Sequence, residues 1–332
     1  MLDWLENDLL LTISSVELAS SDASFRRYFR IKTPEGSYII MDAPPEKENT
    51  ASFINVAEIL THYQVNVPTI FHKNRTEGFL LLEDFGSVCF LDALNTDTAT
   101  DLYHAAFDAL YQLQSLTAHQ VQGLPEYDMP LLQKELAIFT DWFLQALLDI
   151  PVPYQQWDVV CDQLINSALE QPKVCVHRDF HSRNLMVLEH DSPGIIDFQD
   201  AVLGPVTYDL VSLLKDCYIA WPAGQVDTWM VSYYNRLLNA KLIDCSLYCF
   251  TRWFDLMGLQ RHLKAIGIFS RLHLRDGKSN YLPDIPRTLN YVLQVCAFYP
   301  ELKSFGAFLQ QQVLPEFNQV LLIVDTELKA KN

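Results

Sequence analysis

The hydrophobic and polar positions of this chain change their period part-way along it. Up to about residue 90, apolar residues come in short or alternating runs, which is typical of strands. Five runs fit this description, at residues 16–19, 25–32, 37–42, 68–72 and 78–83. One stretch among them differs, because residues 50–63 place Phe53, Val56 and Leu60 at helical spacing on one face. The first part therefore predicts strands with a single helix.

Beyond about residue 96, apolar residues recur every three or four positions, the spacing of helices that bury one face. Helices are expected at about residues 100–116, 131–149, 155–170, 206–220, 226–240, 246–275, 286–298 and 304–327. A hairpin within residues 185–198 is the one strand-like exception. The pattern predicts an α+β fold with a small β-rich N-terminal lobe, residues 1–88, and a large, mostly helical C-terminal lobe, residues 89–332.

The most informative residues of the chain lie at that hairpin. The run from His177 to Asn184 reads H-x-D-x-x-x-x-N, and Asp197 follows after an apolar stretch. Turn-forming residues at 189–194 separate two short apolar runs, which indicates a strand-turn-strand unit. Because a hairpin returns the end of its second strand to the start of its first, Asn184 and Asp197 should meet, with Asp179 on the loop just before them.

That arrangement suits phosphoryl transfer. The reaction needs one carboxylate to orient the attacking hydroxyl, and an amide and a carboxylate to hold Mg²⁺ on the nucleotide phosphates. A buried polar loop between two strands would use the same residue types, since a single Asp or Asn in a turn is usually a cap or a turn former. The spacing of all these residues taken together favours the catalytic interpretation.

Composition and charge limit the classes of molecule that this protein is expected to bind. The sequence has 49% hydrophobic and 20% charged residues, ordinary for a soluble globular protein, and a formal net charge of −17. This charge disfavours nucleic acids and anionic membrane surfaces as partners. No apolar run approaches the ~20 residues of a membrane span. The acidic N-terminus is unlike a signal peptide, and the seven cysteines suit free thiols, so a cytoplasmic protein is expected.

The motif and the order of elements resemble the aminoglycoside phosphotransferase family, whose fold is similar to that of protein kinases. The resemblance covers nearly the whole chain and includes residues 197–200, 204–205 and 208–210. Residues 80–86 look like that family's connector between two lobes, so their Asp-Phe-Gly triplet is interpreted as an adenine-binding connector and not as a metal site. The resemblance implies a two-lobed protein-kinase-like fold, with ATP and Mg²⁺ as cofactors.

Three further segments are similar to the kinases that phosphorylate the anomeric hydroxyl of N-acetylmuramate and N-acetylglucosamine in peptidoglycan recycling. They are residues 41–48, 260–269 and 275–282. This closer resemblance implies an amino sugar as the acceptor and a sugar 1-phosphate as the product. Two other functions stay open: phosphorylation of an aminoglycoside or another small alcohol, and a pseudokinase that binds a nucleotide or a partner without chemistry.

Individual residues receive roles on this basis. Asp179 is expected to be the catalytic base, Asn184 and Asp197 the Mg²⁺ ligands, and His177 a brace for the loop. The nucleotide is expected to contact the loop at residues 20–24 and the connector, through Ser21, Ser24, Arg27, Glu83 and Phe85. The sugar is expected to contact His181, Arg183, Arg261, Lys264 and Arg271.

Two features of this assignment have more than one interpretation. Asp42 stands on the third strand where a kinase has its phosphate-binding lysine, and it would repel ATP unless a cation compensates. The candidates are Arg26, Arg27 and Arg30 on the preceding strand. A basic stripe at helical spacing, made of Arg261, Lys264, Arg271, Arg275 and Lys278, could bind the lactyl carboxylate of N-acetylmuramate or could be a solvated face.

Overall fold

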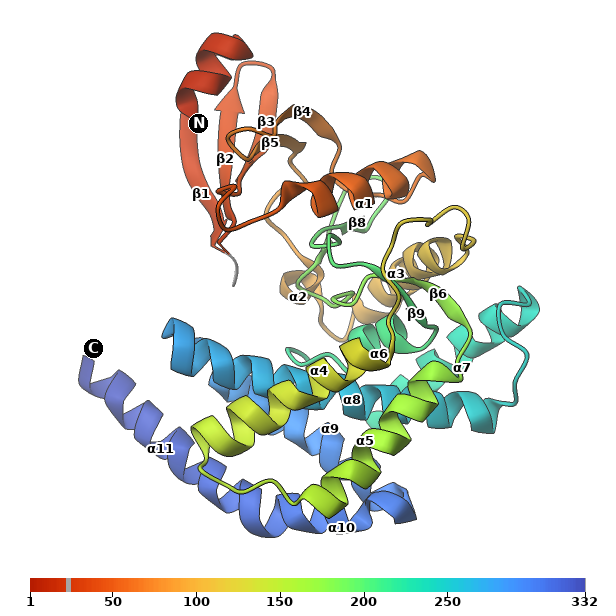
Figure 1. Cartoon of the computed structure of the whole chain (residues 1–332). Coiled ribbons are helices and arrows are strands. Elements are labelled where there is room, and N and C mark those ends of the chain that lie inside the picture. Colours follow the sequence, from red (N-terminus) through yellow and green to blue (C-terminus); the bar gives the residue numbers. More distant parts are fainter. Residues whose placement is uncertain (22–24, 332) are drawn as a thin grey trace. The chain divides into compact units, whose positions relative to one another are not determined.

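The structure is a computed structural model that describes residues 1–21 and 25–331. Contacts between its residues group into two compact units. Unit 1 consists of Met1–Leu124 and His177–Val202, and unit 2 consists of Pro125–Val176 and Leu203–Asn332. The chain therefore passes from one unit to the other three times, and Figure 1 follows it by colour from red to blue.

Unit 1 contains a five-stranded antiparallel sheet with the strand order β1-β2-β3-β5-β4. Its strands are β1 (Ser15–Ser21), β2 (Arg27–Thr33), β3 (Gly36–Asp42), β4 (Ile70–Asn74) and β5 (Phe79–Glu83). The five strands expected from the sequence are thus present. A buried hydrophobic cluster packs on this sheet and consists of Trp4, Leu5, Ile31, Ile40 and Leu81. Trp4 and Leu5 come from a short π-helix, Trp4–Asp8, that the sequence pattern did not indicate.

Helix α1 (Thr50–His62) follows β3, as the sequence predicted. The side chain of Asn49 caps the helix by accepting a hydrogen bond from the Ala51 N–H at 2.8 Å. The buried face of α1 includes Phe53, whose ring lies 4.9 Å from the ring of Phe198. Two more helices of unit 1 are α2 (Phe90–Ala93) and α3 (Ala99–Gln114). Only α3 was expected, because four residues are too few to show a helical period.

The predicted hairpin is present as β7 (Leu185–Met186) and β8 (Gly194–Ile195), with Leu185 opposite Ile195. Backbone hydrogen bonds join it to earlier parts of unit 1. The Val187 N–H donates to the Val88 carbonyl at 2.9 Å, and the Ile195 N–H donates to the Asn66 carbonyl at 2.8 Å. These bonds help to explain why residues 177–202 group with the sheet. A boundary between lobes at residue 88, which would cut the chain only once, stays a prediction.

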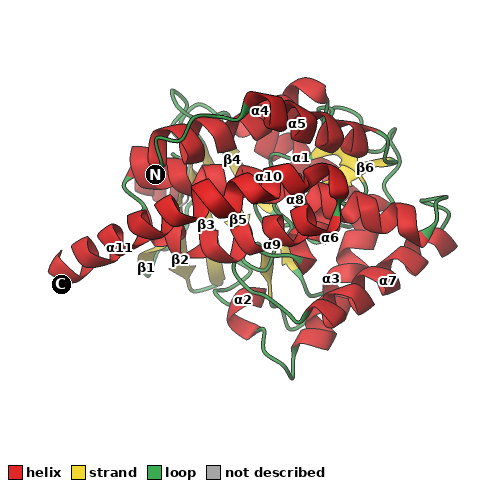
Figure 2. Cartoon of the chain, turned by 90° about the horizontal axis from the view of Figure 1, so that it is seen from below, coloured by secondary structure: helices red, strands yellow, loops and turns green. Residues whose placement is uncertain are grey.

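Unit 2 is mostly helical, as the red ribbons of Figure 2 show. Its α-helices are α4 (Met129–Ile138), α5 (Tyr154–Leu169), α6 (Tyr208–Leu214), α7 (Ala223–Asn239), α8 (Leu247–Asp276), α9 (Ile285–Phe298), α10 (Lys303–Phe308) and α11 (Leu314–Lys331). The helices expected at 131–149 and 304–327 are interrupted by π-helical segments, Phe139–Leu147 and Leu309–Val313. Two short 3₁₀ helices lie at Ser279–Asp284 and Pro300–Leu302. Within the described ranges, no helix is both long and apolar enough to cross a membrane.

Helix α8 is the centre of unit 2. Helices α4, α5, α6 and α9 all pack against it, and its residues are buried around most of its circumference. A helix in this position is enclosed by other helices instead of lying with one face in water. The backbones approach closely at Gly267, where an added Cβ would lie 2.5 Å from the carbonyl oxygen of Ile138. The basic stripe of the sequence therefore lies largely on a helix inside the unit.

A second, two-stranded sheet pairs β6 (Lys173–Val176) with β9 (Val202–Pro205). The expectation that the hairpin is the one strand-like exception among the helices was wrong. Each of these strands has only four residues, most of them buried, and so short an apolar run cannot be told from a piece of buried helix by its period. The two strands lie immediately before and after the segment that contains the predicted catalytic residues.

Candidate active site

The loop from His177 to Asn184 connects β6 to β7, and His177 holds its start. The His177 residue is 1% exposed, and its Nδ1 accepts a hydrogen bond from the Asp179 N–H at 3.2 Å. Its Nε2 must then carry the proton, and it donates to the Ile196 carbonyl at 3.0 Å. One imidazole thus joins the backbone of Asp179 to the residue before Asp197. This geometry agrees with the predicted brace.

Burial keeps the His177 imidazole neutral and lowers its pKa from 6.5 to about 4. In the unfolded chain the imidazole takes up a proton near its ordinary pKa, so stability should fall as the pH drops from about 6.5 towards 4. Between about pH 7.5 and about pH 5, this one group should remove about 2 kcal/mol from the free energy of unfolding. The His177→Asn variant has no side chain at this position that takes up a proton. Between the two pH values its free energy of unfolding should therefore fall by that amount less than the free energy of unfolding of the wild type, as measured by urea unfolding.

A residual acid sensitivity is expected in that variant. His262, in unit 2, is also fully buried, and burial lowers its pKa to about 3. Its contribution should remain when His177 is replaced. An equal loss of stability in the wild type and in His177→Asn between the two pH values would contradict the assignment of a buried, neutral His177.

Asn184 closes the other end of the loop. Its Nδ2 donates to the Asp179 carbonyl at 3.0 Å and lies 3.4 Å from Oδ2 of Asp197. The Ile196 N–H donates to the Asn184 carbonyl at 3.0 Å, which fixes the hairpin end beside the loop. The structure therefore brings Asp179, Asn184 and Asp197 together as the hairpin argument predicted. Their catalytic roles stay predictions.

Besides Asp191 in the hairpin turn, two residues between 177 and 202 have left-handed backbone conformations that non-glycine residues seldom adopt. Arg178 has a φ of 78° and Asp197 a φ of 66°. Such conformations cost free energy, of order 1–3 kcal/mol each, and persist where the surrounding contacts enforce them. Here Arg178 is next to one proposed functional carboxylate, Asp179, and Asp197 is itself the other. Strain of this kind is concentrated at functional sites, which agrees with the catalytic interpretation.

The donor set beside the hairpin suits Mg²⁺, which prefers oxygen ligands and is usually held by one or two protein groups together with phosphates and waters. The oxygens available here are the Asp197 carboxylate and Oδ1 of Asn184. The neighbouring side chain of Gln199 contacts one of these oxygens, because its Nε2 donates a hydrogen bond to Oδ1 of Asp197 at 2.8 Å. Its own Oε1 is buried and has no hydrogen-bond partner among the described residues. A polar atom left in this state fits a site that is completed by a hydrated cation.

The charge of Asp42, which is predicted to stand at the position of a kinase's lysine, is compensated within the sheet. Arg27 stands directly opposite Asp42 in the β2–β3 pairing, and its guanidinium forms an ion pair with the Asp42 carboxylate. The Asp42 side chain is 9% exposed, whereas that of Arg27 is 60% exposed. Nε of Arg26 instead lies 3.8 Å from Oε2 of Glu48. Arg27 is therefore the arginine that balances the negative charge of Asp42. Whether it also contacts a nucleotide stays a prediction.

Arg30 anchors the predicted connector. Its Nε and Nη2 donate to the two carboxylate oxygens of Asp84 at 2.7 and 2.9 Å, and Nη2 also donates to the Gly86 carbonyl at 2.7 Å. Burial alone would raise the pKa of Asp84, but hydrogen bonds from Arg30, Ser37 and the Gly86 N–H outweigh it and lower that pKa. The carboxylate of the Asp-Phe-Gly triplet is thus paired with an arginine, as expected of a connector and not of a metal ligand.

The connector offers fewer backbone groups than the sequence suggested. The Glu83 N–H already donates to the Thr69 carbonyl at 2.9 Å, and the Glu83 carboxylate accepts from the Thr69 N–H at 3.1 Å. Phe85 is buried against the hairpin, where a Cβ on Gly194 would lie 2.4 Å from its ring. Of the predicted phosphate loop, Ser21 ends β1, and Ser24 lies outside the described residues. The nucleotide contacts therefore stay predictions.

The predicted sugar-binding residues are distributed over both units. His181 is buried and Arg183 exposed, both in the loop of unit 1, whereas Arg261 and Lys264 are buried within unit 2. The Lys264 ammonium lies 2.9 Å from the Glu135 carboxylate and donates to the Tyr208 hydroxyl at 3.2 Å. For Arg261 and Lys264, the alternative of a solvated face is wrong. The ion pair with Glu135 also removes the main reason for giving Lys264 to a substrate carboxylate.

The ends of the basic stripe differ from its middle. Arg275 is exposed and pairs with the neighbouring Asp276 at 2.7 Å. Arg271 is half-buried, and burial, together with the charge of Arg275, lowers its pKa. Its Nε is buried and has no hydrogen-bond partner among the described residues. Of the stripe, Arg271 therefore keeps the strongest reason to bind an anion, while a role in binding the sugar stays a prediction.

Comparison with known proteins identifies the family. The model of the phosphotransferase enzyme family matches residues 15–240 of the chain. The chain belongs to this family. The match runs from β1 to the end of α7, includes residues 177–202 with the predicted catalytic residues, and confirms the family resemblance inferred from the sequence. The protein is accordingly a phosphotransferase enzyme.

Relatives of this phosphotransferase from two bacteria share one name. A protein from Pseudomonas putida is 44% identical over 301 residues, covering 90% of this chain and 88% of the relative. One from Neisseria meningitidis serogroup B is 40% identical over 318 residues, covering 94% of each chain. Both are named N-acetylmuramate/N-acetylglucosamine kinase.

Solved structures similar to the phosphotransferase support its fold. Aminoglycoside phosphotransferase APH(2'')-Ib with bound ADP has a TM-score of 0.59 and 11% identity, over 89% of this chain and 97% of that one. Choline kinase LicA from Streptococcus pneumoniae has a TM-score of 0.58 and 13% identity, over 88% and 98%. Identities this low show the fold alone, and that fold is the protein-kinase-like one expected from the sequence.

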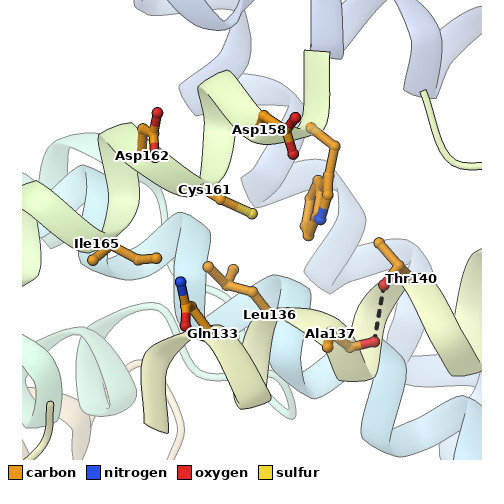
Figure 3. A pocket seen from close by; sticks show the side chains of 9 residues that line it. Gln133, Leu136, Ala137, Thr140, Asp158, Cys161, Asp162 and Ile165 are labelled. Atoms are coloured by element: carbon orange, nitrogen blue, oxygen red, sulfur yellow. Dashed lines mark hydrogen bonds between the residues drawn. The ribbon is translucent and has the colours of Figure 1, made fainter. Parts of the chain in front are cut away.

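A surface hollow of about 460 Å³ lies in unit 2, between α4 with its π-helical continuation and α5 (Figure 3). Leu136 and Ile165 line it together with the carboxylates of Asp158 and Asp162, and the Thr140 hydroxyl donates to the Ala137 carbonyl at its edge. None of the residues predicted from the sequence for the site of the phosphotransferase lines this hollow. It therefore has no part in the assignment of the active site.

Sequence reasoning missed the residues that support the predicted metal ligand. Gln199 touches Asp197, and the Ser52 hydroxyl of α1 donates to the Gln199 carbonyl at 2.6 Å. Ser52 lies 147 residues earlier in the chain, so no local pattern could have revealed this contact. Gln199 stands only two positions after Asp197, and this proximity was the one available signal.

Proposed function

We propose that this phosphotransferase is an ATP- and Mg²⁺-dependent kinase that phosphorylates the anomeric C1 hydroxyl of N-acetylmuramate and N-acetylglucosamine. The product would be the sugar 1-phosphate, formed in peptidoglycan recycling. The observation that carries the choice of substrate is the 44% identity, over 90% of the chain, to a protein named N-acetylmuramate/N-acetylglucosamine kinase. The arrangement of Asp179, Asn184 and Asp197 supports the type of reaction.

Asp179 acts in this proposal as the base that orients and deprotonates the C1 hydroxyl. An anomeric hydroxyl is more acidic than other sugar hydroxyls, so an ordinary carboxylate suffices. The backbone of Asp179 is fixed on both sides, since its N–H donates to His177 and its carbonyl accepts from the Asn184 side chain and the His181 N–H. All three contacts use the backbone of Asp179 and not its carboxylate.

Asn184 and Asp197 would hold Mg²⁺ in this proposal. When bound, Mg²⁺ would neutralise negative charge on the nucleotide phosphates during the transfer. Gln199 and Asn184 each place a donor within hydrogen-bond reach of one Asp197 oxygen, at 2.8 and 3.4 Å, and this limits the rotation of the carboxylate. Arg27, paired with Asp42 and with its side chain 60% exposed, would supply positive charge for the phosphates.

Two other functions predict different outcomes. Phosphorylation of an aminoglycoside is favoured by the net charge of −17, which attracts cationic acceptors, but the named relatives point to amino sugars. A pseudokinase was suggested by Asp42, and the ion pair of Asp42 with Arg27 weakens that reason. The presence of Asp179, Asn184 and Asp197 close to one another also favours an active enzyme.

Phosphorus-31 NMR of separate reactions tests the proposal. Each reaction contains the protein, ATP, Mg²⁺ and one acceptor: N-acetylmuramate, N-acetylglucosamine or kanamycin. We expect an acid-labile sugar 1-phosphate from the first two acceptors and no phosphorylated kanamycin. A phosphorylated kanamycin would assign the protein to the aminoglycoside branch. No product from any acceptor, with ATP left intact, would favour the pseudokinase.

A further inference from the structure

Gln199 contacts the predicted metal ligand and is itself held in place. The residue is 8% exposed, and its Nε2 donates to Oδ1 of Asp197 at 2.8 Å. The direction of this amide is determined by chemistry, because an ionised carboxylate only accepts hydrogen bonds and so must face the NH₂ end of Gln199. With Asn184 Nδ2 3.4 Å from Oδ2, both oxygens of Asp197 lie near a side-chain amide.

This support matters because Asp197 has a left-handed backbone conformation. Its φ of 66° is uncommon for a non-glycine residue, although Asp and Asn adopt it more often than most others. The hydrogen bond from Gln199, two residues later, spans the turn that contains this residue. Phe198, between them, is fully buried and packs on Phe53 of α1 at a ring distance of 4.9 Å. The carboxylate is thereby held in one orientation.

Helix α1 holds Gln199 as well. The Ser52 hydroxyl, in the first turn of that helix, donates to the Gln199 carbonyl at 2.6 Å. A chain of contacts thus runs from α1 through Ser52 and Gln199 to Asp197, and all of these residues lie within unit 1. Ordinary packing would not need a polar connection of this kind, since Phe53 and Phe198 already join the two segments.

The other polar atom of the Gln199 side chain is an acceptor, Oε1. It is buried and has no hydrogen-bond partner among the described residues, and a buried acceptor in this state destabilises the fold unless something donates to it. Mg²⁺ in proteins usually keeps several of its water ligands. A water carried by a cation at Asp197 could donate to Oε1, and the amide would then contact both the carboxylate and the shell of the metal.

We propose that Gln199 is a positioning residue for the divalent metal, which orients the Asp197 carboxylate and accepts a hydrogen bond from the metal's water shell, and that Ser52 couples helix α1 to it. The proposal rests on the proposed function, from which it takes Asp197 as a metal ligand. Residues in this position, next to a ligand but not bound to the metal, commonly change metal affinity by about 10–100-fold when they are replaced.

The test measures metal binding without catalysis. Mn²⁺ is titrated into the full-length protein with ADP and followed by electron paramagnetic resonance, and ADP affinity is measured separately in EDTA. Gln199→Met keeps the length of the side chain and removes both the donor and the acceptor. We expect it to weaken Mn²⁺ binding by about 10–100-fold, while ADP affinity in EDTA and the melting temperature stay close to those of the wild type.

Matched controls separate this effect from general damage. Gln112→Met removes another glutamine Nε2 of unit 1, one that donates to the Gln64 carbonyl at 2.7 Å, and it should leave Mn²⁺ affinity unchanged. Ser52→Ala should weaken Mn²⁺ binding less than Gln199→Met does. Because Ser52 acts through Gln199, the two effects should be less than additive in the double variant. Thr61→Ala, at an exposed position of the same helix, is the control for Ser52→Ala.

Three outcomes would overturn the proposal. Mn²⁺ affinity of Gln199→Met within about twofold of the wild type would mean that the amide does not position the ligand. A parallel loss of ADP affinity in EDTA would indicate a structural role only. Absence of Mn²⁺ binding by wild type with ADP would remove the metal site itself. Failure of the sugar assay alone would instead contradict the proposed function and leave the Mn²⁺ result interpretable.

Discussion

Replacing Asp179 by asparagine should lower kcat for sugar phosphorylation by about 10²–10⁴-fold, the range expected when a general base is removed. Asparagine has nearly the same shape but cannot accept the proton of the C1 hydroxyl. The hydrogen bonds that hold the loop to His177 and Asn184 use the backbone N–H and carbonyl of Asp179, so they should survive the change. Initial rates of ADP release with saturating N-acetylmuramate and ATP give the measurement.

The control for this prediction is Asp191→Asn. Asp191 is an exposed residue of the same segment, in the turn of the hairpin, and its φ of 52° is a conformation that asparagine tolerates well. The kcat of the Asp191→Asn variant should stay within about twofold of the wild type, because surface substitutions of this kind change the folded structure little. If Asp179→Asn kept kcat within tenfold of the wild type, Asp179 would not be the base.

The sequence predicted the arrangement of the catalytic segment well because that arrangement is local. Residues 185–188 and 194–198 can form apolar strands only if the turn between them closes, and closure alone brings Asn184 to Asp197. The brace at His177 is also local, since it reaches the backbone two residues away and the far strand of the same hairpin. Strands and helices of normal length were predictable from their periods for the same reason.

Contacts between distant segments were not predictable in this way. The positive stripe of α8 was interpreted from spacing alone, but Lys264 pairs with Glu135 of α4, and only tertiary packing could show that its charge is balanced within the fold. In the same way, Asp42 was recognised as a departure from kinases, while the pairing register that sets Arg27 opposite to it became visible only in the sheet. Charge patterns therefore located the relevant residues but not their partners.

The grouping of residues into two compact units also depends on contacts between distant segments. Contacts group residues 177–202 with the sheet and α1, which no change of period along the chain indicates, while the boundary at residue 88 stays a prediction. The reason lies in single backbone bonds, such as Ile195 N–H to the Asn66 carbonyl at 2.8 Å, and in the packing of Phe198 on Phe53. These contacts join the predicted metal ligand to elements that lie more than a hundred residues earlier, which is why helix α1 can influence it.

Asp197→Asn is expected to separate metal binding from base catalysis. Loss of the carboxylate should raise the Mg²⁺ concentration for half-maximal activity by more than the roughly 10–100-fold expected for a residue that only supports a ligand. Asparagine is the appropriate substitution because Asp197 has a φ of 66°, which Asn tolerates and Ala does not, so the backbone should remain and the effect can be assigned to the lost charge.

Comparison of the two variants makes the assignment specific. Asp179→Asn should bind Mn²⁺ with ADP as tightly as the wild type and still be slow at saturating metal, because the missing base cannot be replaced by a cation. Asp197→Asn should bind Mn²⁺ weakly and recover part of its activity as the metal concentration rises. ADP affinity in EDTA should be the same in both, since neither carboxylate is expected to attract a nucleotide without its metal. If both variants lost metal affinity equally, Asp179 would be a metal ligand as well. The assignment of the base to the loop and of the metal ligand to the hairpin would then have to be revised.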